Sequence, residues 1–224
     1  MSDQNARVGN INSEQYWDWR FQSGGWAGNG SREQTRSFAL AQTKLFPIEN
    51  EFSGTLLDFG CALGDAFPIY RKRFPRATLV GVDFSHQAIE QCLSTYGKLA
   101  TFFCASHEHC PTADVIICSN VLEHLEDDSA VASSLQERCR LLLIVVPYRE
   151  QYLIEEHVRR YELGHFNSLG CVRQKVFAAK GWSQYGLKPL WWGIRCKNVF
   201  RPAFAKSILR RRLQILYVVE GKLR

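Results

Sequence analysis

Small residues and an aspartate at the end of an apolar segment form the part of the sequence best suited to ligand binding. Residues 55–59 are expected to form a buried strand, with Asp58 near its end, and residues 65–73 a helix. The turn between them contains three small residues, Gly60, Ala62 and Gly64. Small residues let the backbone approach a ligand closely, and ligands bind where the first strand of a doubly wound sheet ends. The turn therefore predicts a cofactor site, although its Gly-x-Ala-x-Gly spacing differs from the Gly-x-Gly-x-x-Gly of dinucleotide folds.

A second acid, Asp83, follows the strand expected over residues 77–82 and lies 25 positions after Asp58. A carboxylate at this place can accept hydrogen bonds from both hydroxyls of a ribose. Ser85 is expected to cap the helix over residues 85–96. Either feature alone indicates only a strand–helix turn or a helix cap. Together, in this order and at this spacing, they favour an adenosine-containing cofactor.

Glu123 and His124 follow the strand expected over residues 115–118 and are candidate catalytic acid–base residues, because such a sheet opens its active site at the ends of its strands. His157, in a charge-rich segment after the fifth strand, is the third candidate. The alternative for Glu123 and His124 is that they only orient their loop and cap the next helix. His165 is a further acid–base candidate, but a histidine beside glycine in an inserted segment is more often a packing residue.

The eight cysteines include no Cys-x-x-Cys pair and lie mostly in apolar stretches, which is typical of a protein in a reduced compartment. One segment combines cysteines with histidines, namely Cys104, His107, His109 and Cys110. A structural zinc site needs four convergent ligands, usually two pairs on separate turns. Because one short segment would have to supply all four, the sequence does not favour zinc.

Short apolar runs alternate with helical stretches after residue 54, which indicates an α/β fold. The runs lack polar alternation, so their strands should be covered on both faces, as in a mainly parallel sheet. We expect a Rossmann-like, doubly wound sheet of about seven strands, with helices on both faces and an N-terminal helical cap. The other expected strands are 100–104, 141–146, 182–192 and 213–219, and the other expected helices are 128–138 and one near 174–180.

A chain of 224 residues is long enough for one sizeable core, and a single domain is predicted. Its parts are a helical cap, a cofactor-binding core, an inserted substrate lid, and the last strands with a basic helix: residues 1–50, 54–147, 148–170 and 171–224. The cap should hold an aromatic-rich helix over residues 13–21 and a helix that a capping box, Ser31 to Gln34, opens and Pro47 closes. No apolar run approaches the roughly 20 residues of a membrane span and no signal segment is evident, so a cytoplasmic location is expected.

Positive charge is concentrated near the C-terminus. From Lys188 onward ten basic residues stand against one acid, which gives this part a charge of +9 and leaves −3 for the rest. Such a part can attract an anionic substrate, nucleic acid or a membrane surface, or can form a solvated helix face.

The glycine turn, the acid at position 83 and the segment from Asp114 to His124 together resemble the class I S-adenosylmethionine-dependent methyltransferases. The resemblance covers residues 54–147 and departs at Ala62, where the family usually has glycine. It implies that S-adenosylmethionine is the cofactor and S-adenosylhomocysteine the product. The cofactor-binding residues that it implies are Tyr16, Arg20, Asp58, Gly60, Cys61, Ala62, Gly64, Asp83, Phe84, Ala105, Ser106, Asn120 and Leu122.

The N-terminal aromatic segment resembles the part that closes over the cofactor in many members that act on small molecules. Arg20 suits the methionine carboxylate, and aromatic faces such as that of Tyr16 suit a sulfonium cation. The alternative is that these aromatic residues only pack the helix on the sheet.

The resemblance implies a methyltransferase that acts on a small polar acceptor, with a hydroxyl of a sugar or another bacterial metabolite favoured. Ubiquinone-pathway O-methyltransferases and small-RNA 3′-terminal ribose methyltransferases use a metal and carry Glu-x-x-Glu-His at this strand end. Here Asn120 replaces the first glutamate, which weakens a site for a hard divalent cation, so magnesium is not favoured and no metal ligand is predicted. An RNA ribose 2′-O-methyltransferase is the alternative, supported by Glu123, His124, His157 and the basic C-terminal part. A cofactor-binding module without catalysis is the third possibility, and the sequence leaves the oligomeric state open.

Overall fold

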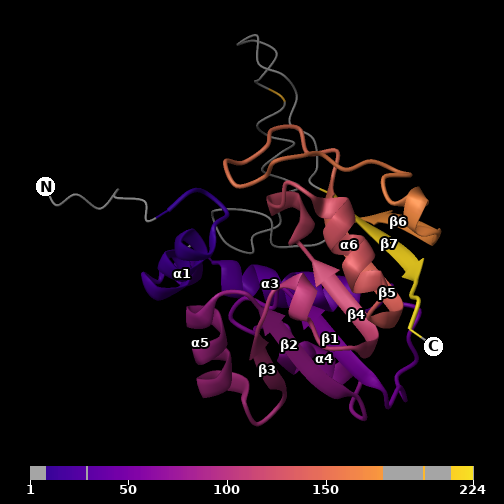
Figure 1. Cartoon of the computed structure of the whole chain (residues 1–224), viewed down its shortest axis with the longest axis horizontal. Helices are drawn as coiled ribbons and strands as arrows, with labels where there is room; N and C mark the ends of the chain where they lie inside the picture. The colour runs from indigo at the N-terminus through magenta and orange to yellow at the C-terminus, as the bar shows by residue number, and fades with distance from the viewer. Residues whose placement is uncertain (1–8, 29, 179–198, 200–212, 224) are drawn as a thin grey trace, which may run out of the picture.

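The computed structural model describes residues 9–28, 30–178, 199 and 213–223 (Figure 1). Seven strands of this part form one sheet in the order β3-β2-β1-β4-β5-β7-β6. They are β1 Thr55–Phe59, β2 Thr78–Asp83, β3 Thr101–Cys104, β4 Ala113–Ser119, β5 Cys139–Tyr148, β6 Cys171–Phe177 and β7 Leu213–Glu220. The first five strands pair in parallel, whereas β7 is antiparallel to both β5 and β6. The predicted doubly wound α/β fold with a mainly parallel sheet is confirmed.

Helices cover both faces of this sheet. They are α1 Glu14–Gln22, α2 Gly25–Gly28, α3 Ser31–Gln42, α4 Phe67–Arg73, α5 His86–Tyr96 and α6 Asp128–Gln136, with 3-10 turns η1 His107–His109, η2 Leu122–His124 and η3 Asn167–Leu169. One apolar cluster joins α3, α4 and α5 to one face, and a second joins α6 to the other. Leu56 and Leu57 belong to different clusters because successive side chains of a strand point to opposite faces.

Some local predictions need correction, and others lie outside the described residues. The helix expected near residues 174–180 is wrong for residues 174–177, because these belong to β6 and pair with β7. Residues 179–180 lie outside the described residues. The capping box at Ser31 is also wrong: Gly30 is the N-cap of α3, with φ +77° and no side-chain cap. The helix ends at Gln42, before Pro47. The strand expected over 182–192 and the basic helix lie outside the described residues.

The segment that follows β5 lies above the carboxyl ends of the parallel strands in Figure 1. Asp128, the buried first residue of α6, anchors this segment. The Asp128 carboxylate accepts hydrogen bonds from three side chains of the segment. The donors and distances are Arg159 Nη1 at 2.6 Å, the Tyr161 hydroxyl at 3.0 Å and His165 Nε2 at 2.8 Å. His165 therefore packs the insertion onto the core, as the alternative reading of that residue expected.

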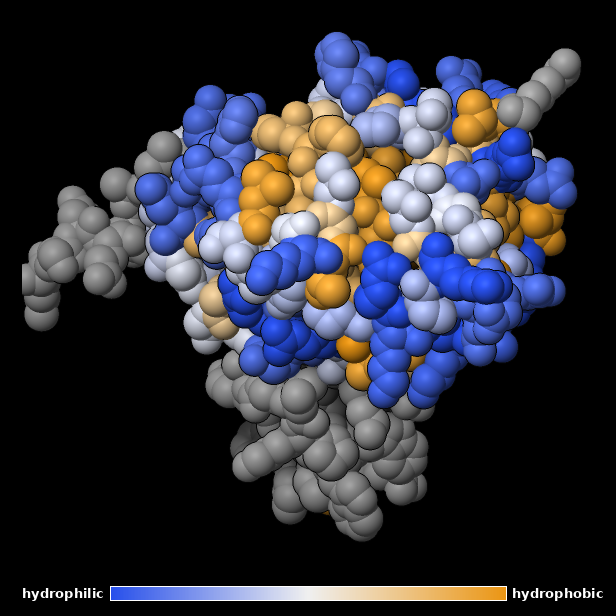
Figure 2. Space-filling view, turned by 90° about the horizontal axis from the view of Figure 1, so that it is seen from below, coloured by the Kyte–Doolittle hydropathy of each residue, from blue (hydrophilic) through white to orange (hydrophobic). Residues whose placement is uncertain are grey.

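The opposite side of the molecule has a mixed surface. Apolar residues gather near the middle of that face, and hydrophilic residues surround them (Figure 2). Among the described residues, no helix is both long enough and apolar enough to span a bilayer.

Candidate active site

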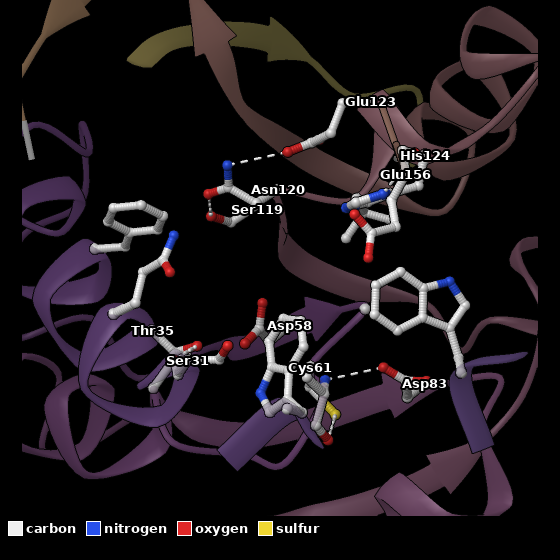
Figure 3. Close-up of a pocket in the computed structure, with 18 of the residues that line it drawn as sticks. Ser31, Thr35, Asp58, Cys61, Asp83, Ser119, Asn120, Glu123, His124 and Glu156 are labelled. Carbon is white, nitrogen blue, oxygen red and sulfur yellow. Dashed lines mark hydrogen bonds between the residues drawn. The ribbon is translucent and has the colours of Figure 1, made fainter. Parts of the chain in front are cut away.

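A cavity of about 630 Å³ lies where β1, β2 and β4 end (Figure 3). Its volume falls within the range of small-molecule sites. The β1–α4 turn, α1, α3, η2 and the insertion supply its walls. The predicted site residues that line it are Arg20, Asp58, Gly60, Cys61, Ala62, Asp83, Phe84, Asn120, Glu123, His124 and His157. Glu123, His124 and His157 thus share one cavity with most of the expected cofactor residues, whereas His165 does not line it.

Five predicted cofactor residues do not line this cavity: Tyr16, Gly64, Ala105, Ser106 and Leu122. Leu122 is fully buried in the core. Gly64 lies against α5, where an added Cβ would come within 2.9 Å of the Tyr96 ring. The Ala105 amide donates to the Asp83 carbonyl at 3.0 Å and continues the pairing of β2 with β3. Their contact with a cofactor stays a prediction.

Asp83 holds the glycine turn against the end of β2. Its Oδ2 accepts a hydrogen bond from the Ala62 amide at 2.9 Å, and its Oδ1 accepts one from the Ser85 amide at 3.0 Å. Burial raises the pKa of Asp83 to about 6, although these backbone donors oppose the shift. A carboxylate has about four acceptor positions, so these two hydrogen bonds do not use its full capacity to accept from hydroxyl donors. Ser85 caps α5 as predicted, with its side chain accepting from the Ala88 amide.

The turn itself depends on backbone that favours glycine. Gly60 has φ +74° and Ala62 has φ +47°, both in the left-handed region. The left-handed conformation strains Ala62 by about 1–2 kcal/mol, a strain that glycine at this position would not have.

Gly60→Ala is expected to lower the free energy of unfolding by about 2–4 kcal/mol, because it adds backbone strain and a clash. The new Cβ would lie 2.3 Å from Cγ2 of Val121. Gly170→Ala is the matched control, since Gly170 has φ +73° but no heavy atom within 4 Å of an added Cβ. Its free energy of unfolding should fall by only about 1–2 kcal/mol, because the substitution adds backbone strain without a clash. Equal losses for the two variants in urea unfolding would show that the approach to Val121 is not the cause.

Asp58 is a buried acid on the cavity wall, and no basic side chain of the described residues forms an ion pair with it. Burial and the nearby charge of Asp83 raise the pKa of Asp58 to about 8, although a hydrogen bond from Tyr70 acts to lower it. Figure 3 shows Asp58 between Ser31 and Thr35 on one side and Asp83 on the other. A cationic ligand here would stabilise the ionised carboxylate.

Helix α3 contributes a cavity wall that the sequence analysis missed. Its lining residues are Ser31, Gln34, Thr35, Phe38, Ala39 and Gln42. They follow the three- and four-residue spacing of one helix face, and this was the available signal.

At the end of this face, the Ser119 hydroxyl donates to Gln42 Oε1 at 3.1 Å, and Gln42 Nε2 donates to Gln214 Oε1 at 3.2 Å. Gln214 Nε2 donates in turn to Asn120 Oδ1 at 2.8 Å, so a network of amides and one hydroxyl fixes Asn120.

Glu123 has the properties of a general base at neutral pH. Its side chain is buried, with Oε1 accepting from Asn120 Nδ2 at 3.1 Å, and Oε2 has no hydrogen-bond partner within the described part of the chain. Burial raises the pKa of Glu123 to about 7, although the charge of His157 opposes the shift. One potential ligand atom from each of Glu123, His124 and His157 lies within 4.8 Å of those of the other two, close enough to bind one cation.

His124 presents a neutral imidazole. Its Nδ1 lies 3.0 Å from the Glu156 carbonyl, which can only accept, so Nδ1 carries the proton and Nε2 the lone pair. Burial and the neighbouring His157 lower the pKa of His124 to about 4. Trp17 and His157 pack edge-on against the ring, with centroids 5.2 and 4.9 Å away.

Glu156 joins the cap to the insertion above the cavity, a link that the sequence analysis did not predict. Its Oε1 accepts from the Tyr16 hydroxyl at 2.8 Å and pairs with Arg20 Nη1 at 3.1 Å. Burial would raise the pKa of Glu156, but Tyr16 and Arg20 hold it below its ordinary value. Arg20, expected to bind the methionine carboxylate, therefore already has a carboxylate partner.

Residues 57–141 match a family model described as a methyltransferase domain. No curated protein matches the sequence. The plantazolicin methyltransferase BpumL, solved in complex with SAH, is 16% identical over 94% of this chain and 96% of its own, with a TM-score of 0.57. A phosphoethanolamine N-methyltransferase 2 of Haemonchus contortus is 15% identical over 96% of this chain and 60% of its own, with a TM-score of 0.61. Coclaurine N-methyltransferase is 12% identical over 82% and 72%, with a TM-score of 0.55. At these identities the likeness shows a shared fold.

Proposed function

We propose that this chain, a class I S-adenosylmethionine-dependent methyltransferase, moves a methyl group to a hydroxyl of a small polar acceptor, such as a sugar or another metabolite. Glu123 would take the proton of that hydroxyl. The observation that carries this proposal is the carboxyl group of Glu123, a residue that lines the cavity. Its buried Oε2 has no hydrogen-bond partner among the described residues, and its pKa is about 7.

The cavity residues fit S-adenosylmethionine in charge and shape. Asp58 offers a buried carboxylate to its cationic part, and Asp83 keeps acceptor positions for the two ribose hydroxyls. Gly60 lines the cavity, and its left-handed backbone, with φ +74°, forms the turn that would pass close to the methionine part. When bound, S-adenosylmethionine supplies a methyl group activated by a positively charged sulfur.

The affinity for S-adenosylmethionine is expected to rise about fivefold to tenfold from pH 6.5 to 7.5, because Asp58 is mostly protonated below its pKa of about 8 and a cation favours its ionised form. Binding at pH 7 should release a proton, which titration calorimetry in buffers of different ionisation enthalpy measures. Asp58→Asn, of the same size, should weaken binding and flatten this dependence. An Asp58→Asn protein that kept the full dependence would assign it to another group.

The chain's own residues would then align the acceptor and remove its proton. A base with a pKa near the working pH is the most effective, which favours Glu123 over His124 with its pKa of about 4. We propose residues 148–170 as the substrate lid, since Ile154, Glu156 and His157 of this segment line the cavity. Together with α1 it would keep water from the reacting groups.

A screen with methyl-labelled S-adenosylmethionine tests the proposed function. The acceptors would be small hydroxylated compounds, small amines and short single-stranded RNA, each with and without magnesium, followed by mass spectrometry of the labelled product. The amines belong in the screen because two of the similar structures are N-methyltransferases. Label on an oxygen of a small compound supports the proposal, and label only on nitrogen would reject the hydroxyl acceptor.

One observation favours the RNA ribose methyltransferase as a second candidate. Glu123, His124 and His157 converge as the side chains of a divalent cation site would, and magnesium-dependent transfer to RNA would select this alternative. Such transfer should weaken steeply with salt, because phosphate contacts release counterions. Tight S-adenosylhomocysteine binding without transfer to any acceptor would instead indicate a non-catalytic module.

A further inference from the structure

We propose that Glu150 is a positioning residue for methyl transfer, which holds the imidazole of His157 in a fixed orientation beside Glu123. This inference rests on the proposed function, in which Glu123 is the base. Glu150 belongs to none of the sequence motifs. It is also not among the residues that line the cavity, since its side chain contacts His157, which does line it.

The contact between Glu150 and His157 is short and shielded from water. Oε2 of Glu150 lies 2.6 Å from Nδ1 of His157, and the two side chains are 5% and 4% exposed. An ionised carboxylate only accepts hydrogen bonds, so Nδ1 carries a proton in this pair. Exchange of a proton with the cavity then goes through Nε2, and the contact fixes both the tautomer and the tilt of the ring.

The backbone directs Glu150 inward through a strained residue. Arg149, directly after β5, has φ +47°, which costs about 1–3 kcal/mol for a residue with a side chain. Its amide donates to the Tyr161 carbonyl at 3.0 Å, and Arg160 Nε donates to the Glu150 carbonyl at 2.7 Å. The insertion thus holds the turn on both sides, so the inward carboxylate is a built feature of the fold.

Stability alone does not explain a carboxylate at this position. Removing an ion from water costs several kcal/mol, and a buried ion pair often stabilises no better than apolar residues of similar volume. Moreover, Oε1 of Glu150 has no hydrogen-bond partner among the described residues. The same turn carries another acid–base contact, Arg149 to Glu162 at 2.9 Å, which lies on the surface and avoids this cost.

The fixed ring stands next to the proposed base. The Val158 amide donates to the Glu123 carbonyl at 2.8 Å and ties the insertion to η2 beside His157. The acids near His157 are Glu123, Glu150 and Glu156, and His124 packs against its ring. Burial lowers the pKa of His157, but the hydrogen bond to Glu150 and these carboxylates raise it above its ordinary value. His157 and Glu123 line the same cavity with ligand atoms within 4.8 Å of each other, so Glu150 acts on the base by holding the ring of His157 in place.

The test compares Glu150→Gln and Glu150→Asp with the control Glu162→Gln, all in the full chain. Histidine labelled with ¹⁵N gives the protonation and tautomer of His157, with its signals assigned by His157→Gln. We expect Glu150→Gln to change these signals and to lower kcat about 10- to 100-fold on the acceptor found with labelled cofactor. KM for that acceptor and Kd for S-adenosylhomocysteine should stay within about threefold. Glu150→Asp, which keeps the charge, should restore part of kcat, and Glu162→Gln should change nothing.

A Glu150→Gln protein with full kcat, or with unchanged His157 signals, would overturn the positioning role. A variant that lost only thermal stability, with kcat intact after correction for folded protein, would make Glu150 a structural residue and also overturn it. If the unaltered chain methylates no acceptor, the proposed function fails. The ¹⁵N signals then decide between an oriented and a mobile His157, and unchanged signals in Glu150→Gln overturn the inference by themselves.

Discussion

Replacement of Glu123 by glutamine is expected to slow methyl transfer by about 10²- to 10⁴-fold, the usual contribution of a general base. The amide keeps the size of the side chain and can still contact Asn120, but it cannot take a proton from a hydroxyl. The affinity for S-adenosylhomocysteine should stay within about threefold, because Glu123 lies across the cavity from Asp83 in Figure 3. The rates are measured on the acceptor found with labelled cofactor.

The pH profile provides a second test of the same base. The pKa of Glu123 is raised to about 7, so its carboxylate forms as the pH rises through that value and kcat should rise with it. In Glu123→Gln this rise should disappear. Glu126→Gln is the matched control, an exposed acid three residues further along that does not line the cavity. A Glu123→Gln protein with a rate within a few-fold of the unaltered chain would remove Glu123 from the chemistry.

Replacement of Asp83 by alanine is expected to weaken S-adenosylhomocysteine binding at least tenfold, as titration calorimetry would measure. The change removes the acceptor for two ribose hydroxyls and also the partner of the Ala62 and Ser85 amides. Each lost charged hydrogen bond is worth about 1.5–3 kcal/mol, and 1.4 kcal/mol corresponds to a factor of ten in Kd.

Asp114→Ala separates a local effect on binding from a general loss of stability. Asp114 also accepts a hydrogen bond from a backbone amide of the sheet, that of Thr55 at 2.8 Å, but it lies at the start of β4, away from the cavity. This control should lower the free energy of unfolding and leave the affinity unchanged. Unchanged affinity in Asp83→Ala would refute the assignment of the ribose site.

The sequence predicted the parts of the site that depend on neighbouring positions of one strand and its turn. Asp58, Asp83 and Glu123 could be placed at one edge of the sheet because each follows a buried apolar run, and the carboxyl ends of parallel strands meet there. The core strands were placed to within a few residues for the same reason, since their burial on both faces leaves a continuous apolar run.

Features that depend on contacts between distant segments could not be predicted. The pairing of Arg20 with Glu156 joins residues 136 positions apart, and no local pattern marks either partner for the other. The contact of Glu150 with His157 lies within one loop, but only the left-handed turn at Arg149 directs the carboxylate inward. At β6 the pairing with β7 overrides a helical local pattern, as tertiary context often does.

A crystal structure of the full chain with S-adenosylhomocysteine would measure the central claim directly. We expect the ligand's adenosine in the cavity, both ribose hydroxyls within hydrogen-bond distance of the Asp83 carboxylate, and the homocysteine chain over the turn from Gly60 to Ala62. A ligand bound elsewhere, or a ribose directed away from Asp83, would contradict the account.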